Sequence, residues 1–237
     1  MNHFVISASL VFICSLPVSV YFLSLRKRKV DHYFGLFWLS VAFWTCFVGF
    51  QFRWLTVLSD FMWGWLLHLG CISVPVLFAH FTLYLTDNRT RYAKALKLIY
   101  TVAAIFIGLN TVTNLFTSQT IYRDYYAYPK PEVLYPLYIT FFQAVGLWTF
   151  ILILEWRSRL AQESKPFVSL FLLVHVLAYL GCMDNFLIMY EHRIFPLYPY
   201  GLYLLLPYVV IGSFAFLRLQ TNRSKPFRFE FGKFSDR

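Results

Sequence analysis

The chain contains seven long apolar runs, and each is long enough to cross a lipid bilayer as an α-helix. A run of this length satisfies its backbone hydrogen bonds by forming a helix, because the bilayer core offers no water. Only 14% of the residues are charged, which excludes a soluble globule and a disordered chain. The sequence therefore predicts an all-α, polytopic integral membrane protein. The expected transmembrane helices cover residues 4–24, 33–52, 61–86, 95–115, 134–155, 167–190 and 197–219.

Positive charges are divided unequally between the two sets of connecting segments. The segments after the first, third and fifth runs, together with the C-terminal tail, carry 17 Lys and Arg, and the opposite side carries four. Cytoplasmic loops carry the excess of positive charge, so we expect the N-terminus outside and the C-terminus inside, in a bacterial inner membrane. These loops also account for the net charge of +10, so no nucleic-acid partner is expected. Residues 1–220 would form one seven-helix domain, and 221–237 a short basic and aromatic tail.

Several ionisable and amide side chains fall within the expected helices, where such groups are costly and mark candidate functional sites. A rise of about 1.5 Å per residue places most of them in the outer half of the membrane. Polar groups from several helices at one depth predict a ligand pocket that opens to the outside. The candidate ligand-binding residues are His68, Asn110, Asn114, Gln143, Asp184, Asn185, Tyr200 and Tyr203. The alternative is that these groups hydrogen-bond to one another across helices.

Asp184 is the most informative of these residues, because a carboxylate inside a membrane needs a partner, water or a proton. His68 and Arg193 are both candidate partners for it. The longest connection, residues 116–133, is rich in tyrosine and ends with two prolines. Such a stiff aromatic segment could cover the pocket, dock a partner or rest on lipid headgroups.

Other chemistry has little support in the sequence. His68 and His175 could ligate a haem only if they face one another at matching depth. The four cysteines lie within apolar runs without CxxC spacing, so neither a disulfide framework nor a metal site is expected. The HExxH, GxSxG and Walker motifs do not occur. We therefore expect a protein that is not an enzyme and that holds no cofactor.

Two of the apolar runs resemble the N-terminal seven-helix sensor region of bacterial membrane histidine kinases and diguanylate cyclases. The likeness rests on residues 37–44 (FWLSVAFW) and 74–85 (VPVLFAHFTLYL), with weaker support from Asn110, Asn114 and the segment 215–218. The resemblance implies a module that senses an external or membrane-borne ligand and signals to a cytoplasmic output domain. No output domain is expected after Leu219, so the chain would either act through a separate partner or be one component of a larger membrane assembly. Only His80 carries over from the family, as a structural landmark.

Three functions remain open from the sequence. The leading hypothesis is a membrane sensor in which shifts at Pro75 and Pro207 reach a cytoplasmic partner through the tail. The second is an accessory subunit of a photosynthetic or respiratory membrane complex. The third is an electron carrier with haem between His68 and His175. The expected partners are the lipid bilayer, a protein docked on the tail or on aromatic helix faces, and a small-molecule or lipid ligand.

Overall fold

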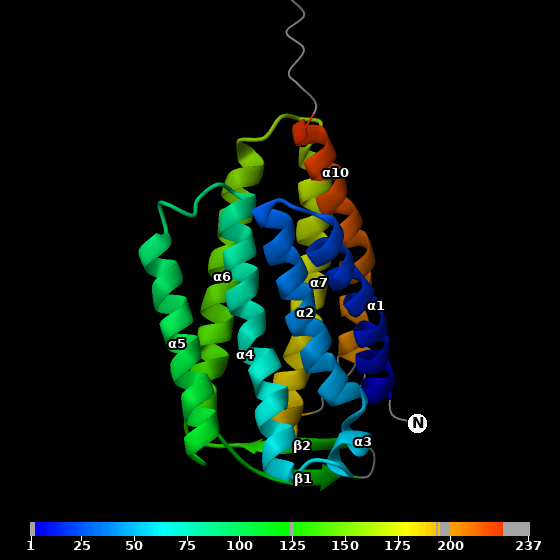
Figure 1. Cartoon of the computed structure of the whole chain (residues 1–237), viewed down its shortest axis with the longest axis vertical. Coiled ribbons are helices and arrows are strands. Elements are labelled where there is room, and N and C mark those ends of the chain that lie inside the picture. Colours follow the sequence, from blue (N-terminus) through cyan, green and yellow to red (C-terminus); the bar gives the residue numbers. More distant parts are fainter. Residues whose placement is uncertain (1–2, 124–125, 193, 195–199, 225–237) are drawn as a thin grey trace, which may run out of the picture.

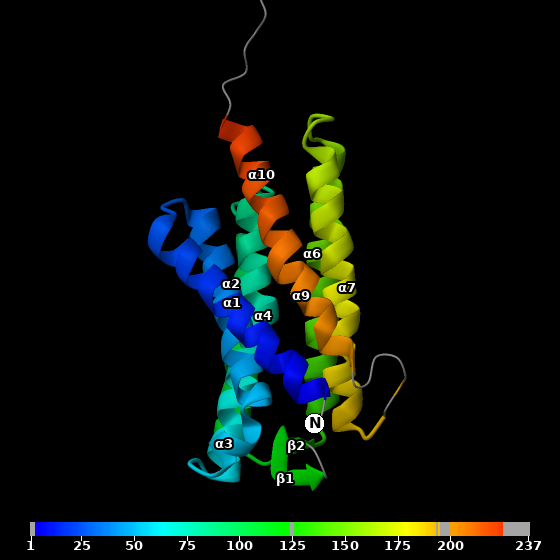
Figure 2. The ribbon, with the colours of Figure 1, turned by 90° about the vertical axis from the view of Figure 1, so that its right-hand side faces the viewer.

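The computed structural model describes residues 3–123, 126–192, 194 and 200–224. Within these ranges the side chains of Phe52, Arg123, Asp184 and residues 222–224 are not described. The described part is a bundle of long helices, drawn from the side in Figures 1 and 2. The part of the tail beyond residue 224 lies outside the described residues.

Seven helices of the described chain are long and apolar enough to cross a membrane, which confirms the expected multi-pass helical architecture. Which end faces the cytoplasm stays a prediction from the charge count. A short helix, α3 (Gln51–Leu55), follows the second span. The spans are α1 (His3–Leu25), α2 (Lys29–Gly49), α4 (Asp60–Leu85), α5 (Ala93–Val112), α6 (Tyr135–Ser158), α7 (Lys165–Met189) and a composite helix, Gly201–Thr221.

The composite seventh span changes its helical type along its length. It begins as the 3₁₀-helix η1 (Gly201–Leu204) and continues as a single α-helical turn, α9 (Leu205–Pro207). A π-helical segment, η2 (Tyr208–Gly212), follows, and α10 (Ser213–Ser224) completes the span. Pro207 lacks a backbone N–H and stands where the helix changes type. By contrast, α4 runs unbroken through Pro75.

The helices α2 and α4 form the centre of the bundle and are the most buried of the long helices, whereas α5 lies at its edge (Figure 1). Small residues allow the two central helices to approach closely. A Cβ atom at Gly70 of α4 would lie 2.8 Å from the backbone nitrogen of Trp44 in α2. This is the small-residue packing expected between helices in a membrane.

Residues of the expected long loop form a two-stranded antiparallel hairpin instead, with β1 (Thr117–Arg123) and β2 (Tyr126–Pro131). The hairpin lies across the end of the bundle opposite to the C-terminal end of α10 (Figures 1 and 2). The backbone N–H of Ala127 donates to the Gln51 side chain at 3.0 Å, and the Tyr128 hydroxyl donates to Glu191 at 3.1 Å. The hairpin therefore packs on the helices through one face.

Candidate functional site

The structure distributes the residues expected to form an outer pocket over separate neighbourhoods. His68 is fully buried beneath the hairpin, where its Nδ1 donates to the Gly64 carbonyl at 2.8 Å. Its Nε2 lies 3.4 Å from the Tyr135 hydroxyl, and its ring meets Phe116 edge to face. Both nitrogens of His68 therefore have protein partners, and this histidine serves to join α4 to α6.

The remaining candidates divide between structural contacts and the surface. Asn110 accepts a hydrogen bond from Thr117 at 2.9 Å and so attaches the end of α5 to β1, whereas Asn114 is exposed. Tyr200 is also exposed, and the Tyr203 hydroxyl lies 3.3 Å from His3.

Residues on α6 and α7 lie closer to cavities. Asn185 is buried and lines a small void of about 10 Å³ beside Trp44. Gln143 accepts from the Tyr179 hydroxyl and donates to the Met183 sulfur at 2.9 Å. The side chain of Asp184 and its candidate partner Arg193 lie outside the described residues.

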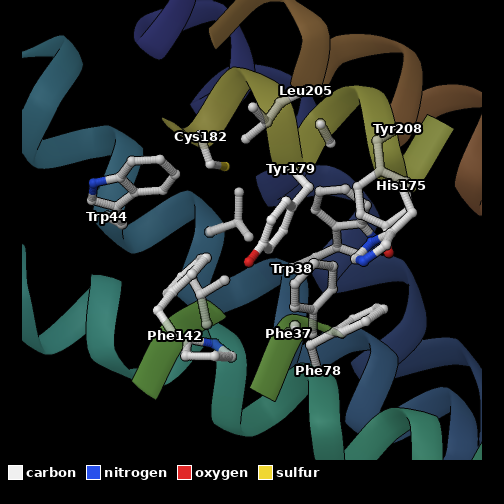
Figure 3. Close-up of a pocket in the computed structure, with 15 residues that line it drawn as sticks. Phe37, Trp38, Trp44, Phe78, Phe142, His175, Tyr179, Cys182, Leu205 and Tyr208 are labelled. Carbon is white, nitrogen blue, oxygen red and sulfur yellow. The ribbon is translucent and has the colours of Figure 1, made fainter. Parts of the chain in front are cut away.

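An apolar pocket lies at the centre of the bundle, at mid-depth instead of in the outer half. Five spans contribute to it: α2, α4, α6, α7 and the composite seventh span. Figure 3 shows its aromatic wall, which includes Phe37, Trp38, Trp44, Phe78 and Phe142. The cavity has a volume of about 60 Å³.

Four polar atoms in the wall of this pocket are buried without a hydrogen-bond partner. They are the Nε1 atoms of Trp38 and Trp44, Nδ1 of His175 and the hydroxyl of Tyr208. Each unpaired buried polar group costs about 1–3 kcal/mol, so native proteins rarely keep one without a reason. The accessible surface of the cavity is almost wholly apolar, and these four atoms belong to residues that line it, so the pocket is a candidate ligand site.

Three of these side chains form a cluster, which we call the polar triad: Trp38, His175 and Tyr208. The Tyr208 ring centroid lies 5.1 Å from that of Trp38 and 5.3 Å from that of His175. Figure 3 shows the three rings gathered on one side of the pocket. The His175 ring is held in place by Phe78, on which it stacks at 4.5 Å with an interplanar angle of 12°.

A groove between α6 and α7 meets the central pocket from the outer surface of the bundle. Its volume is about 460 Å³, and it shares Gly146, His175 and Tyr179 with the pocket. Its rim includes Leu147 and Leu180, which are 61% and 47% exposed. Exposed leucines on transmembrane helices face lipid, so the groove faces the bilayer and borders the central pocket at the three shared residues.

The two histidines considered for haem lie at different depths. His175 stacks on Phe78, and Phe78 follows His68 in α4 by ten residues, or about 15 Å along the helix. The structure therefore does not bring His68 and His175 to one haem. The described residues contain no group of three or more His, Cys, Asp or Glu side chains placed to hold a metal ion.

His80, the landmark of the sensor resemblance, lies near the opposite end of α4 from the hairpin. It stacks on Tyr33 at 3.7 Å, and the Tyr100 hydroxyl lies 2.8 Å from its Nδ1. It therefore links α2, α4 and α5, away from the central pocket.

Outside the spans, two hydrogen bonds of the hairpin shift the pKa of the groups that make them. The Tyr122 hydroxyl donates to Asp60 at 2.6 Å, and this bond raises the pKa of Tyr122 to about 12. The Ser118 hydroxyl donates to Glu132 at 2.6 Å, which lowers the pKa of that carboxyl. Both bonds help to hold the hairpin in its observed position.

One feature of the sequence points to the central pocket. Trp and Tyr favour the membrane interface, yet Trp38 and Tyr208 fall near the middle of their spans, at the depth of His175. Side chains with polar ends are costly in the middle of a membrane span. Trp38, His175 and Tyr208 therefore mark a candidate site more specifically than the amide side chains near the helix ends. No family model matches this sequence, and no curated protein matches it significantly.

Proposed function

We propose that this protein is a non-enzymatic membrane sensor whose central pocket binds an uncharged lipophilic molecule with a carbonyl group. The observation that carries the proposal is the polar triad, three residues with unpaired polar atoms that line an apolar pocket next to a lipid-facing groove. The proposed ligand site is thus at mid-depth, and not in the outer half as the sequence suggested.

The polar triad favours a ligand that accepts hydrogen bonds. The indole Nε1 of Trp38 can only donate, and the Tyr208 hydroxyl can donate as well. A carbonyl oxygen accepts two hydrogen bonds, which matches these two donors. The described lining of the pocket includes no Lys, Arg, Asp or Glu to pair with a charged ligand. A neutral ketone, ester, amide or quinone has the required chemistry.

The sizes of the two spaces favour a ligand with a narrow carbonyl end and an alkyl remainder. The cavity of about 60 Å³ is smaller than the roughly 150 Å³ that accepts a benzene ring, so it would take only a carbonyl and its neighbouring carbons. The groove of about 460 Å³ would hold the chain. A ligand dissolved in the bilayer would reach both spaces sideways, between α6 and α7.

The composite seventh span would carry the response. Tyr208 is both a member of the polar triad and the first residue of the π-helical segment η2, and π segments are frequent at functional sites. Beyond it, Phe216 of α10 packs on Phe34 at 4.4 Å, near the end of the bundle where α10 finishes. A bond from Tyr208 to the ligand would favour one arrangement of this span. The change would then reach a cytoplasmic partner, as the resemblance to sensor regions implies.

The proposal is tested by thermal unfolding of the protein in lipid nanodiscs with a matched pair of probes. Methyl decyl ketone has the required carbonyl, and dodecane has the same chain without it. We expect the ketone to raise the unfolding temperature more than dodecane does, because only the ketone satisfies the polar triad. In the Tyr208→Phe variant, which keeps the ring and removes the hydroxyl, the two probes should act alike. Equal effects of both probes on the unchanged protein would contradict the proposal.

A further inference from the structure

A second cleft lies at the end of the bundle where α1 turns into α2 and α10 finishes. It has a volume of about 320 Å³ and is lined by the turn and by the last turns of α10. Figure 2 shows that α1 crosses the composite span obliquely, so that the two separate toward this end. The lining residues are Leu25, Arg26, Lys27, Arg28, Asp31, Gln220 and Thr221.

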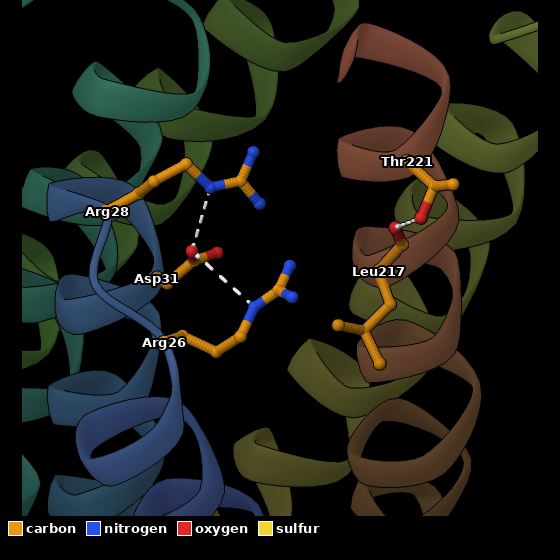
Figure 4. A network of polar contacts seen from close by, with 5 residues as sticks. All are labelled: Arg26, Arg28, Asp31, Leu217 and Thr221. Carbon is orange, nitrogen blue, oxygen red and sulfur yellow. Dashed lines mark hydrogen bonds and ion pairs between the residues drawn. The ribbon is translucent and has the colours of Figure 1, made fainter. Parts of the chain in front are cut away.

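The two arginines of the cleft are oriented by one buried carboxylate. Asp31 is 1% exposed, and its Oδ2 accepts from Nε of Arg28 at 2.9 Å and lies 3.7 Å from Nε of Arg26. Figure 4 shows the outer nitrogens of both guanidinium groups turned toward the gap between the turn and α10. Nε of Arg28 is hydrogen-bonded to Asp31, whereas Nε of Arg26 makes an ion-pair contact with Asp31 and no hydrogen bond.

The charge of the cleft favours an anion. Its three cations, Arg26, Lys27 and Arg28, outnumber its one carboxylate, which leaves a net charge of +2. Guanidinium groups with free outer nitrogens bind phosphate through pairs of parallel hydrogen bonds. A phosphate that carries one or two negative charges would neutralise the cleft.

An amide on the opposite wall supplies an independent sign of a missing ligand. Gln220 of α10 lines the cleft with 3% of its surface exposed, and its Nε2 is buried without a hydrogen-bond partner. An amide N–H₂ can only donate, so the partner that it lacks is an acceptor. Oδ1 of Asp31, which also lines the cleft, is likewise buried without a partner. A phosphate oxygen in the cleft would be a further acceptor for the Gln220 amide if the side chain turned toward it.

The position of the cleft relates this phosphate to the bilayer. It lies where α1 ends, α2 begins and the apolar window of the composite span finishes, which is the depth of lipid headgroups. Leu25, which also lines it, is 69% exposed and offers an apolar surface for an acyl chain. We propose that the cleft binds the phosphate group of an anionic phospholipid, which bridges the α1–α2 turn and α10. This inference does not depend on the proposed ligand of the central pocket.

The test measures thermal unfolding in nanodiscs of phosphatidylcholine alone and of phosphatidylcholine with phosphatidylglycerol. Arg26→Gln combined with Arg28→Gln removes two cations from the cleft. The matched control, Lys94→Gln with Arg159→Gln, removes two exposed cations from the same end of the bundle. We expect the anionic lipid to raise the unfolding temperature of the unchanged protein and of the control by about 5 °C. In the double arginine variant, most of this increase should disappear.

A second variant keeps the test valid if the loss of both arginines prevents folding around Asp31. Gln220→Met preserves the volume and the arginine–Asp31 contacts while it removes the amide donor. We expect this variant to need about tenfold more anionic lipid for the same rise in unfolding temperature, because hydrogen bonds to a charged phosphate are strong. A response of Gln220→Met equal to that of the unchanged protein would overturn the proposal. The proposal would also be overturned if the control variant lost as much of the lipid response as the double arginine variant.

A further arm of the experiment identifies the source of the phosphate. Inorganic phosphate is added to nanodiscs of phosphatidylcholine alone, against chloride at the same ionic strength. Stabilisation by phosphatidylglycerol but not by inorganic phosphate would support the lipid as the ligand. Stabilisation by inorganic phosphate that Gln220→Met abolishes would support the phosphate site and contradict the lipid as its source. No stabilisation by either would overturn the site itself.

Discussion

Gly146 of α6 lies directly against the ring of Tyr179 on α7, and both residues border the groove as well as the central pocket. A Cβ atom at position 146 would stand 2.6 Å from Cε2 of that ring, well inside van der Waals contact. The absence of a side chain at Gly146 therefore sets the position of Tyr179, whose hydroxyl donates to Gln143. The contact lies where the groove borders the pocket, on the proposed connection between the bilayer and the pocket.

Gly146→Ala should push the Tyr179 ring away from α6 and narrow that connection. We expect about tenfold weaker stabilisation by methyl decyl ketone, and a loss of about 1–3 kcal/mol in the free energy of unfolding from overpacking. Gly108→Ala is the matched control, because a Cβ atom there meets nothing within 4 Å. Thermal unfolding with and without the ketone measures both effects. Unchanged ketone binding in Gly146→Ala would show that the ligand does not pass this contact.

The two buried histidines should respond in opposite ways to replacement by phenylalanine. His68→Phe removes the hydrogen bond to Gly64 and the contact with Tyr135, at a cost of about 1–3 kcal/mol in the free energy of unfolding. His175→Phe removes a nitrogen that has no partner, so stability should stay the same or rise. The affinity of the His175→Phe variant for methyl decyl ketone should fall. Denaturant unfolding of both variants in one detergent compares them, and a large loss of stability in His175→Phe would assign that residue a purely structural role.

The bond between Tyr122 and Asp60 should be visible in an alkaline titration. Asp60 raises the pKa of Tyr122 to about 12, so the stabilisation from this bond is complete below pH 10 and is lost as the pH rises through 12. The tyrosinate absorbance of the unchanged protein minus that of Tyr122→Phe should therefore titrate near pH 12. In an Asp60→Asn background the same difference should shift down toward pH 10. A difference that already titrates near pH 10 in the unchanged protein would mean that the bond does not form.

Gln51 should be essential for the attachment of the hairpin. Its Oε1 is the acceptor for the buried N–H of Ala127, and Gln51→Met would leave that donor unpaired at a cost of about 1–3 kcal/mol. Hydrogen exchange of residues 126–131 should then become faster. Gln119→Met, on the exposed side of β1, is the control and should leave the exchange unchanged. Equal exchange in the two variants would contradict the contact between Gln51 and the hairpin.

The helical architecture was predictable from the sequence because each span satisfies its own backbone hydrogen bonds, so hydropathy alone locates it. The hairpin was not predicted, because residues 116–133, with Pro129 and Pro131, were expected to form a stiff aromatic connection. A two-stranded ribbon has only edge strands, where proline costs no interior ladder hydrogen bond, and here these prolines face Thr120 and Thr117.

The central pocket could be predicted only in part. Depth along a helix follows from residue number, so the position of His175 near the middle of its span can be read from the sequence. The direction in which each residue faces depends on how the helices pack. For this reason Asn110 and Asn114, expected in one pocket, instead lie at the end of α5, one bonded to β1 and one exposed. Trp38 and Tyr208, on spans far apart in the sequence, meet only in the folded bundle.

The most direct test of the proposed central site is photoaffinity labelling in nanodiscs with an alkyl ketone that carries a diazirine next to the carbonyl. Mass spectrometry of the digested protein would then locate the label. We predict labelling of α7 near His175 and of the composite span near Tyr208, with strong reduction in Gly146→Ala. Labelling confined to lipid-facing residues such as Leu98 and Ile105 of α5, and unchanged in Gly146→Ala, would contradict a ligand site at the centre of the bundle.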